Sequence, residues 1–249
     1  MSAPADHPPR GGFPWLLVVV TLAALAVLLS LGTWQVQRLQ WKEALIATID
    51  QRLAAPPVPL ADVEAVQPRS DIEYRPTRVA GTFLHDREQF FLATHDGQSG
   101  WYVYTPLRLD DGRILFVNRG FVPFDRRDPA TRAEGQVAGR VELDGLAREA
   151  PAAKPSWVVP DNEPAKRTFY WKDLSAMTQA AALGGEQVVP FFVDAGRAAN
   201  PGDLPVGGVT IVSLPNRHLE YAVTWFGIAA ALVVISGTLI WRRMRPARP

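Results

Sequence analysis

The chain has 249 residues, of which 47% are hydrophobic and 20% are charged, and its formal net charge at pH 7 is +1. These values indicate a folded domain together with a modest number of residues inside a membrane. The near-neutral charge argues against a nucleic-acid-binding protein, since no basic patch is interleaved with aromatic residues. Because the sequence has no cysteine, it excludes disulfides, thiolate nucleophiles, iron–sulfur clusters, covalently attached haem and cysteine-based copper or zinc sites.

Two segments of opposite character begin the chain. Residues 1–12 are rich in Pro and Gly and are expected to be disordered; they do not resemble an organellar transit peptide, which favours a bacterial protein. Residues 13–35 are predicted to form a transmembrane helix, because no charge occurs from Gly11 through Gln37. The apolar run is too long for a signal peptide and lacks a small-residue cleavage site, so we expect the helix to remain uncleaved.

Residues 36–60 are predicted to extend this helix beyond the membrane and then to form a linker at the Pro-rich stretch 54–60. Trp34, Arg38 and Trp41 fall on one face of the extension by helical spacing. An aromatic belt with Arg38 reaching the headgroups explains the first two, but not Trp41, which lies about two turns further on. A docking surface for another helix or for a partner explains all three, so Trp34 and Trp41 are candidate partner-binding residues.

Residues 61–214 are predicted to form one β-rich domain outside the membrane, because the hydrophobic period changes from helical to two. We expect a barrel or a sandwich with one or two helices, an α+β fold. Strands are expected at 74–83, 89–95, 100–109, 113–123, 135–147, 167–171, 188–195 and 207–214, with a helix at 174–183.

Residues 215–241 comprise a membrane-entry segment and the second predicted transmembrane helix, and residues 242–249 form a basic tail. The 21 residues from Tyr221 to Trp241 carry no charge, enough to cross roughly 30 Å of hydrocarbon at about 1.5 Å per residue. Four arginines and no acid follow, so the positive-inside rule predicts cytoplasmic termini and a periplasmic β-rich domain. His218 then lies at the outer edge of the membrane.

His218 is the candidate ligand in this sequence. On a helix, His218, Tyr221 and Trp225 share one face at spacings of three and seven. An imidazole over two aromatic rings at the membrane surface suits the iron of a flat, apolar cofactor, whereas a histidine that only hydrogen-bonds there is the alternative. His85 and His95 flank a predicted hairpin without an obvious third ligand and make a weak metal site.

Motifs of the common enzyme classes are absent from the sequence, which has no G-x-S-x-G elbow, P-loop, dinucleotide-binding glycine motif or H-E-x-x-H. Arg119 ends a predicted strand beside Gly120 and could bind a carboxylate or propionate; a structural arginine that bonds loop carbonyls is the alternative. The sequence therefore predicts a protein that is not an enzyme and has no catalytic residues.

Six segments, in order along nearly the whole chain, together resemble the surfeit locus protein 1 family of cytochrome c oxidase assembly factors. They are LGTWQVQRLQWK at 31–42, YRPTRVAGTF at 74–83, GWYVYTPL at 100–107, DDGRILFVNRGFVP at 110–123, PFFVDA at 190–195 and PNRHLEYAVTWFG at 215–227. Two positions depart from the family pattern: position 121 is Phe where the family often has Trp, and position 217 is Arg where a smaller polar residue is expected.

The resemblance implies a multi-pass protein of the bacterial inner membrane that takes part in biogenesis of the respiratory chain. It implies that haem a binds at the outer mouth of the membrane helices and is inserted into the oxidase catalytic subunit. That subunit, other assembly factors and the lipid bilayer are the implied partners. His218 is then the ligand of the haem iron. On this hypothesis the further cofactor contacts are Tyr221, Trp225 and Trp34 over the macrocycle and Arg38, Arg119 or Arg217 at the propionates.

A haem-independent membrane scaffold or chaperone is the alternative. It would hold the oxidase subunit through the β-rich domain and the Trp-lined helices, without binding haem. A two-span sensor is disfavoured, because the sequence shows no cytoplasmic output domain.

Overall fold

The computed structural model describes most of the chain, namely residues 15–67, 71–198, 200–210 and 214–245. The predicted disordered segment 1–12 and the end of the basic tail lie outside the described residues. The chain divides into two compact units, one formed by Met1–Thr48 with Ser213–Pro249 and the other by Ile49–Val212.

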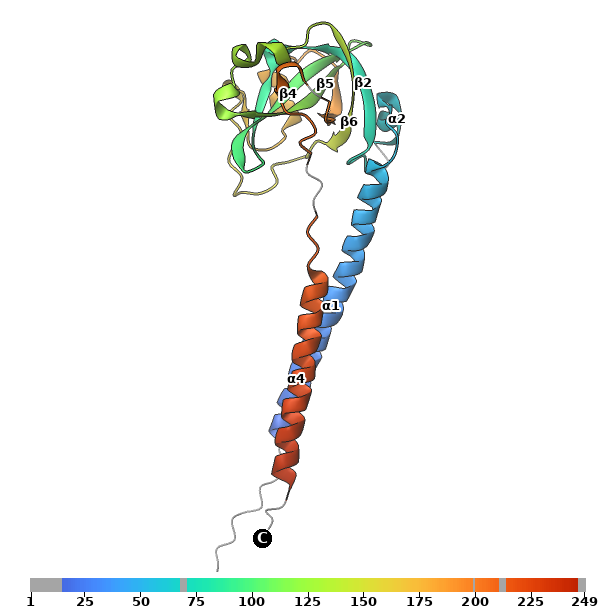
Figure 1. Ribbon diagram of the computed structural model, residues 1–249, viewed down its shortest axis with the longest axis vertical. Coiled ribbons are helices and arrows are strands. Elements are labelled where there is room, and N and C mark those ends of the chain that lie inside the picture. Colours follow the sequence, from blue (N-terminus) through green and yellow to red (C-terminus); the bar gives the residue numbers. More distant parts are fainter. Residues whose placement is uncertain (1–14, 68–70, 199, 211–213, 246–249) are drawn as a thin grey trace, which may run out of the picture. The chain divides into compact units, whose positions relative to one another are not determined.

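Among the described residues, four α-helices and eight strands make up the fold, together with short 3-10 helices. Figure 1 shows how they are connected. The helices are α1 (Trp15–Leu53), α2 (Leu60–Val66), α3 (Leu174–Ala180) and α4 (His218–Met244). The strands are β1 (Val58–Pro59), β2 (Pro76–Phe83), β3 (Gln89–His95), β4 (Gln98–Leu109), β5 (Ile114–Pro123), β6 (Arg140–Glu149), β7 (Thr168–Phe169) and β8 (Val188–Ala195).

The first unit is a pair of long helices, α1 and α4, and both are long and apolar enough to cross a membrane. α1 runs without a break through 39 residues, which confirms the predicted helical extension as far as Leu53. The prolines at 56 and 57 follow after two alanines and prevent the helix from continuing. In α4, Glu220 lies in the first turn and Arg242 and Arg243 lie in the last, each with the sign that the helix dipole favours.

Small residues bring α1 and α4 together. The buried residues of α4 recur every seven positions and are Ala222, Ala229 and Ser236. Thr21 of α1 donates a hydrogen bond of 3.1 Å to Ser236. At Gly32 of α1, an added Cβ would lie only 2.8 Å from the ring of Phe226. Such close approach of helix backbones through small residues is typical of helix pairs in membranes.

A closed barrel of five strands organises the second unit (Figure 1). Its strands follow the order β2-β6-β8-β5-β4, and β4 pairs back with β2 to close the circle. β5 and β8 run parallel, and the other barrel pairs are antiparallel. β1 adds to β2, β3 to β4 and β7 to β3. The β-rich prediction is confirmed, and the choice it left open is decided in favour of a barrel.

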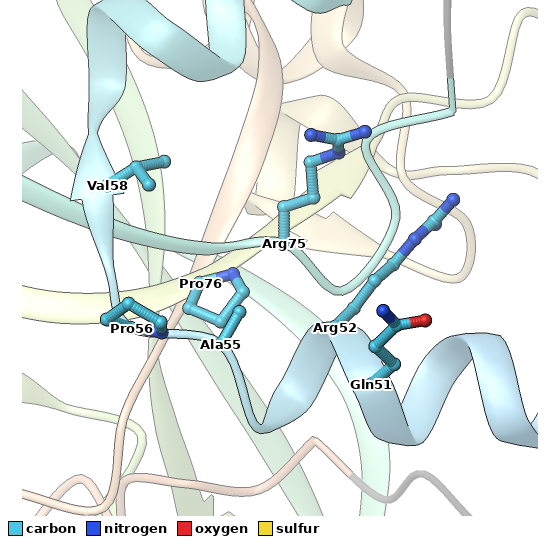
Figure 2. A pocket seen from close by; sticks show the side chains of 7 residues that line it. All are labelled: Gln51, Arg52, Ala55, Pro56, Val58, Arg75 and Pro76. Carbon is cyan, nitrogen blue, oxygen red and sulfur yellow. The ribbon is translucent and has the colours of Figure 1, made fainter.

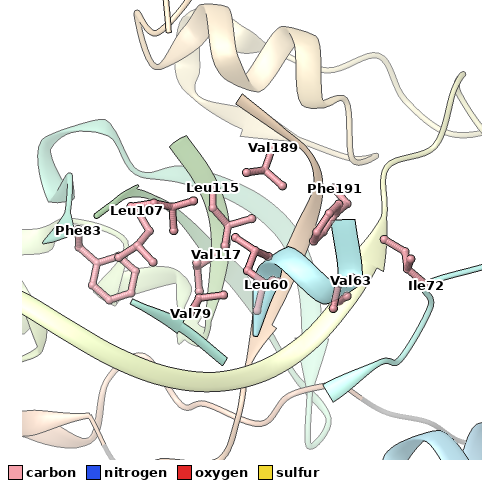
Figure 3. Close-up of a cluster of buried hydrophobic side chains, with 13 residues drawn as sticks. Leu60, Val63, Ile72, Val79, Phe83, Leu107, Leu115, Val117, Val189 and Phe191 are labelled. Atoms are coloured by element: carbon pink, nitrogen blue, oxygen red, sulfur yellow. The ribbon is translucent and has the colours of Figure 1, made fainter. Parts of the chain in front are cut away.

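The barrel interior holds the main hydrophobic core, to which all five barrel strands and α2 contribute (Figure 3). Leu115 and Val117 of β5 belong to this cluster, whereas Ile114 and Phe116 belong to a second one together with Met177 of α3. Because successive side chains of a strand point to opposite faces, the second cluster lies on the outer face of the barrel wall and is covered by α3.

Two strand predictions are wrong in detail. Residues 135–139 precede the fifth long strand rather than belong to it, because a short helical segment, Pro129–Gly135, reaches into this stretch. The described part of the predicted strand at 207–214 is not a strand; only Val206, just before it, forms an isolated bridge, with Phe121. β8 pairs with β5 only as far as Asn118, and beyond it Phe121 exchanges two backbone hydrogen bonds with Val206, at 2.9 and 2.8 Å.

Gly120 is the glycine of the barrel whose replacement by any other residue is tolerated least. Its φ is +129°, and a Cβ there would lie 1.9 Å from the carbonyl oxygen of Val206. Gly112, in the β4–β5 turn, has a φ of +90° but no atom within 4 Å of the added Cβ. We expect Gly120→Ala to cost about 1–3 kcal/mol more stability than Gly112→Ala, because only the first forces backbone apart. Urea unfolding of the two variants measures the difference; equal midpoints would contradict it.

Candidate functional site

His218 is the first residue of α4 and lies within reach of a buried polar side chain of α1. Its Nδ1 is 2.7 Å from Oε1 of Gln35, which is 9% exposed. Because an amide oxygen only accepts hydrogen bonds, Nδ1 carries the proton and Nε2 keeps its lone pair. Within the described part of the chain no protein group bonds Nε2. The half-buried imidazole is thus held in the tautomer in which Nε2 can coordinate a metal.

Sequence reasoning missed Gln35, although its signal is present in the chain. Gln35 ends the predicted membrane helix, in a stretch with no charge. Polar side chains inside such helices face a neighbouring helix far more often than lipid, and there they bond a polar partner.

The aromatic residues predicted to share a face with His218 are in different surroundings. Trp225 is half-buried, as His218 is, and it follows the buried Ala222 by three residues on the side of α4 that faces α1. Tyr221 is 54% exposed and lies off this side. The structure therefore groups His218 with Trp225 and leaves Tyr221 open to its surroundings.

Trp34, Arg38 and Trp41 form an exposed face of α1, as the helical spacing predicts. The two tryptophans are 53% and 50% exposed, and the guanidinium carbon of Arg38 lies 4.0 Å from the centroid of the Trp41 ring. A cation stacked on an indole is a preorganised, partly apolar surface. This face is accessible to lipid, to a flat ligand or to another protein.

Arg217 is exposed and immediately precedes α4. A spacing of three residues on a helix would allow it to pair with Glu220, but the described residues show no ion pair between the two. The backbone carbonyl of Arg217 accepts from the N–H of Tyr221, at 3.3 Å. The guanidinium remains one of the cationic groups at the beginning of α4.

Arg119 belongs to the barrel unit, on the same face of β5 as the interior residues Leu115 and Val117. Its side chain is 2% exposed and donates to the carbonyl of Gly135 and, at 3.3 Å, to Oδ1 of Asn200. Burial lowers the pKa of Arg119 to about 10. These are the surroundings expected for the structural alternative.

Glu88 is the counter-charge for Arg119 and for a second buried arginine, Arg132. Arg119 lies 3.6 Å from Glu88, and Arg132 binds both carboxylate oxygens of Glu88 through its two terminal nitrogens. Burial alone raises the pKa of Glu88, but the nearby His85, the hydrogen bonds from Arg132 and the charges of both arginines outweigh it, so the pKa is lowered. One carboxylate therefore anchors two cations inside this unit.

His85 and His95 contribute to packing and hydrogen bonding. His85 donates from Nε2 to the carbonyl of Val137 at 2.9 Å, and His95 packs 5.4 Å from the ring of Phe121. Among the described residues there is no group of three or more His, Cys, Asp or Glu side chains that could hold a metal ion. The described residues therefore add no third ligand to the weak metal site predicted at His85 and His95.

A cavity of about 250 Å³ lies where the end of α1 meets the chain that enters β2. Figure 2 shows its lining, with Gln51 and Arg52 from α1 and Arg75 and Pro76 from the other side. Arg52 is committed to the protein, since it bonds Asp71 and a backbone carbonyl at 2.8 Å each. This cavity has no free acid–base pair in its lining and was not foreseen from the sequence.

Comparison with known proteins gives one consistent result. The family model described as the SURF1 family matches residues 22–230. "Surfeit locus protein 1" of Xenopus tropicalis is 40% identical over 235 residues, which cover 87% of this chain and 72% of the relative. The human protein of that name is 39% identical, over 87% and 74%. The "SURF1-like protein" of Monosiga brevicollis is 38% identical over 88% and 84%. The chain belongs to the SURF1 family.

Proposed function

We propose that this protein is an assembly factor of haem–copper cytochrome c oxidase that binds haem a and aids its insertion into the catalytic subunit. The observation that carries the proposal is His218, whose Nδ1 is engaged by Gln35 at 2.7 Å while Nε2 has no partner among the described residues. Membership of the SURF1 family supports the same proposal, on the resemblance given above.

The residues present suit haem as a cargo. A neutral imidazole nitrogen is a common axial ligand of haem iron, and a tautomer fixed by a second hydrogen bond is typical of metal-binding histidines. Trp225 is the aromatic residue that shares the surroundings of His218, and Trp34 and Tyr221 offer exposed rings. Arg38 and Arg217 are exposed cations suited to propionates. Arg119 is the least suited, because its donors are already used inside the barrel unit.

A carrier has to release what it binds, and this requirement fits a single protein ligand. Holding and handing over haem makes and breaks only the coordination bond and weak contacts, so no catalytic residue is needed. We place the protein in a bacterial inner membrane with cytoplasmic termini, because two apolar helices enclose the barrel domain in sequence and arginines follow the second. The barrel would then be periplasmic.

The haem-independent scaffold is the second candidate, and it is favoured by the exposed tryptophans of α1. Trp34 and Trp41 are each at least half exposed, and large exposed aromatic residues are enriched where proteins bind one another. On this reading the oxidase subunit docks on the helices and the barrel, and haem plays no part.

His218→Ala is expected to abolish the haem absorption spectrum of the protein, or to shift it, because the variant removes the axial nitrogen and leaves the helix intact. The measurement is an absorption spectrum of protein purified in detergent from cells that make haem a. His95→Ala, which removes a histidine of the barrel unit, serves as the matched control and should keep the spectrum.

An unchanged spectrum in His218→Ala would refute the ligand assignment. A haem-free protein that still co-purifies with the oxidase subunit would favour the scaffold.

A further inference from the structure

A row of polar and aromatic side chains crosses the outer face of the barrel. Neighbouring strands contribute one after another, since Tyr104 is paired with Asn118 and Asn118 with Asp194 in the strand register. Arg148 of β6 continues the row beyond Asp194, and Phe91 of β3 begins it. Together with Lys172 and Thr210 these side chains line a cavity of about 240 Å³. None of them belongs to the site at His218.

Asp194 and Arg148 form the rigid end of this cavity. Asp194 is 3% exposed and accepts hydrogen bonds from Asn118 at 3.1 Å, Thr210 at 2.8 Å and Arg148 at 2.8 Å. Arg148 also donates to Glu73, at 2.6 Å. Burial lowers the pKa of Arg148, but the two carboxylates outweigh it and raise that pKa. These groups satisfy one another and need no ligand.

Lys172 and Tyr104 form the other end and are not satisfied in this way. The described residues place no carboxylate within ion-pair distance of Lys172, whose ammonium lies 5.7 Å from the centroid of the Tyr104 ring. Burial lowers the pKa of Lys172. Tyr104 is fully buried, and its hydroxyl has no hydrogen-bond partner among the described residues. A buried donor without a partner costs roughly 1–3 kcal/mol, so the Tyr104 hydroxyl requires an explanation, and the half-buried Lys172 lines the same cavity.

The Lys172 ammonium can only donate and the Tyr104 hydroxyl can donate, so a partner that binds both of them is an acceptor. A carboxylate supplies two acceptor oxygens and a charge opposite to that of Lys172. Phe91 and Tyr102 give the cavity an aromatic side; their ring centroids lie 6.5 Å apart and the ring planes are inclined by only 9°. The cavity volume limits the ligand to a small molecule.

We propose that this cavity is a binding site for a small planar carboxylate, whose oxygens bind the Lys172 ammonium and the Tyr104 hydroxyl and whose flat body packs against Phe91 and Tyr102. The site lies wholly within the barrel unit and does not depend on haem binding at His218. It gives the barrel a ligand of its own.

Calorimetric titration of the full chain in detergent tests this, with benzoate, acetate and inorganic phosphate as separate probes. Benzoate is expected to bind saturably and more tightly than acetate, because only benzoate offers a ring to the aromatic wall. Lys172→Met should weaken benzoate binding at least about tenfold, and Tyr104→Phe about three- to tenfold. Lys154→Met removes a lysine of a surface ion pair and should leave the affinity unchanged.

Thermal unfolding separates a ligand site from a structural role. Lys172→Met should raise the unfolding midpoint without ligand, because it removes a half-buried ammonium that has no counter-ion in contact. A lysine that serves only the fold would lower that midpoint when replaced. Absence of saturable benzoate binding, binding of phosphate alone, or equal benzoate affinity in all three variants would each overturn the proposal. Haem binding at His218 should be the same in every variant.

Discussion

Replacing Glu88 by Gln is expected to lower the free energy of unfolding of the barrel unit by about 3–5 kcal/mol. The side chains of Glu88 and Arg132 are each 1% exposed, and that of Arg119 is 2% exposed. Glutamine keeps the volume and one acceptor oxygen but removes the charge, so two buried guanidinium groups lose their common counter-ion. Urea unfolding of the full chain in detergent measures the loss.

The matched control is Glu186→Gln. Glu186 pairs with Arg108 at 3.1 Å, but the two side chains are 37% and 40% exposed, and such surface pairs contribute about 0–1 kcal/mol. A loss of similar size in both variants would show that the buried cluster is no more important than a surface pair.

The same carboxylate predicts an acid dependence. The pKa of Glu88 in the folded protein is below its usual value of 4.5, so its contribution to stability is complete above that value. It is lost as the pH falls through the lower, folded-state pKa. The stability difference between the unchanged protein and Glu88→Gln should therefore be constant near neutral pH and shrink below about pH 4.5. A difference that stays constant to pH 3 would contradict this.

Much of the fold follows from local patterns in the sequence. The alternation of apolar residues located strands such as Gln89–His95 and Val188–Ala195, and the charge-free runs located both long helices. These local patterns do not show which strands pair with one another. The closing contact between β2 and β4 joins Gly81 to Leu109, and no local pattern in either segment marks it.

The candidate site shows the same division between local and distant information. His218 stands out from the sequence because it begins a membrane helix, but its partner Gln35 lies 183 positions away. Their meeting depends on how two helices are aligned, and no local pattern carries that alignment. The sequence around Arg119 allowed two interpretations, a ligand-binding arginine or a structural one. Its charge lies inside the apolar run ILFVNRGFV, and a charge buried there requires a counter-charge. Glu88 is that counter-charge.

Replacing Gln35 by Leu is expected to weaken haem binding about 10- to 100-fold, which is the usual cost of losing the second hydrogen bond of a metal-binding histidine. Leucine has a similar size and suits a membrane helix, but it leaves Nδ1 of His218 without an acceptor. The imidazole could then rotate or change tautomer, and Nε2 would no longer be held in the orientation and tautomer that can coordinate the haem iron. Haem titration of the purified protein, followed by absorption, measures the affinity.

Two companion variants separate positioning from packing. Gln35→Glu keeps an acceptor oxygen at the same place, so it should retain haem binding and change the absorption maximum, because a carboxylate makes the imidazole a stronger donor to iron. Gln37→Leu changes an exposed glutamine of the same helix and should have no effect. If Gln35→Leu binds haem as tightly as the unchanged protein while His218→Ala does not, then His218 is a ligand that needs no positioning partner. If Gln35→Glu also loses haem, the amide itself is required, and the fixed tautomer is not what prepares this site.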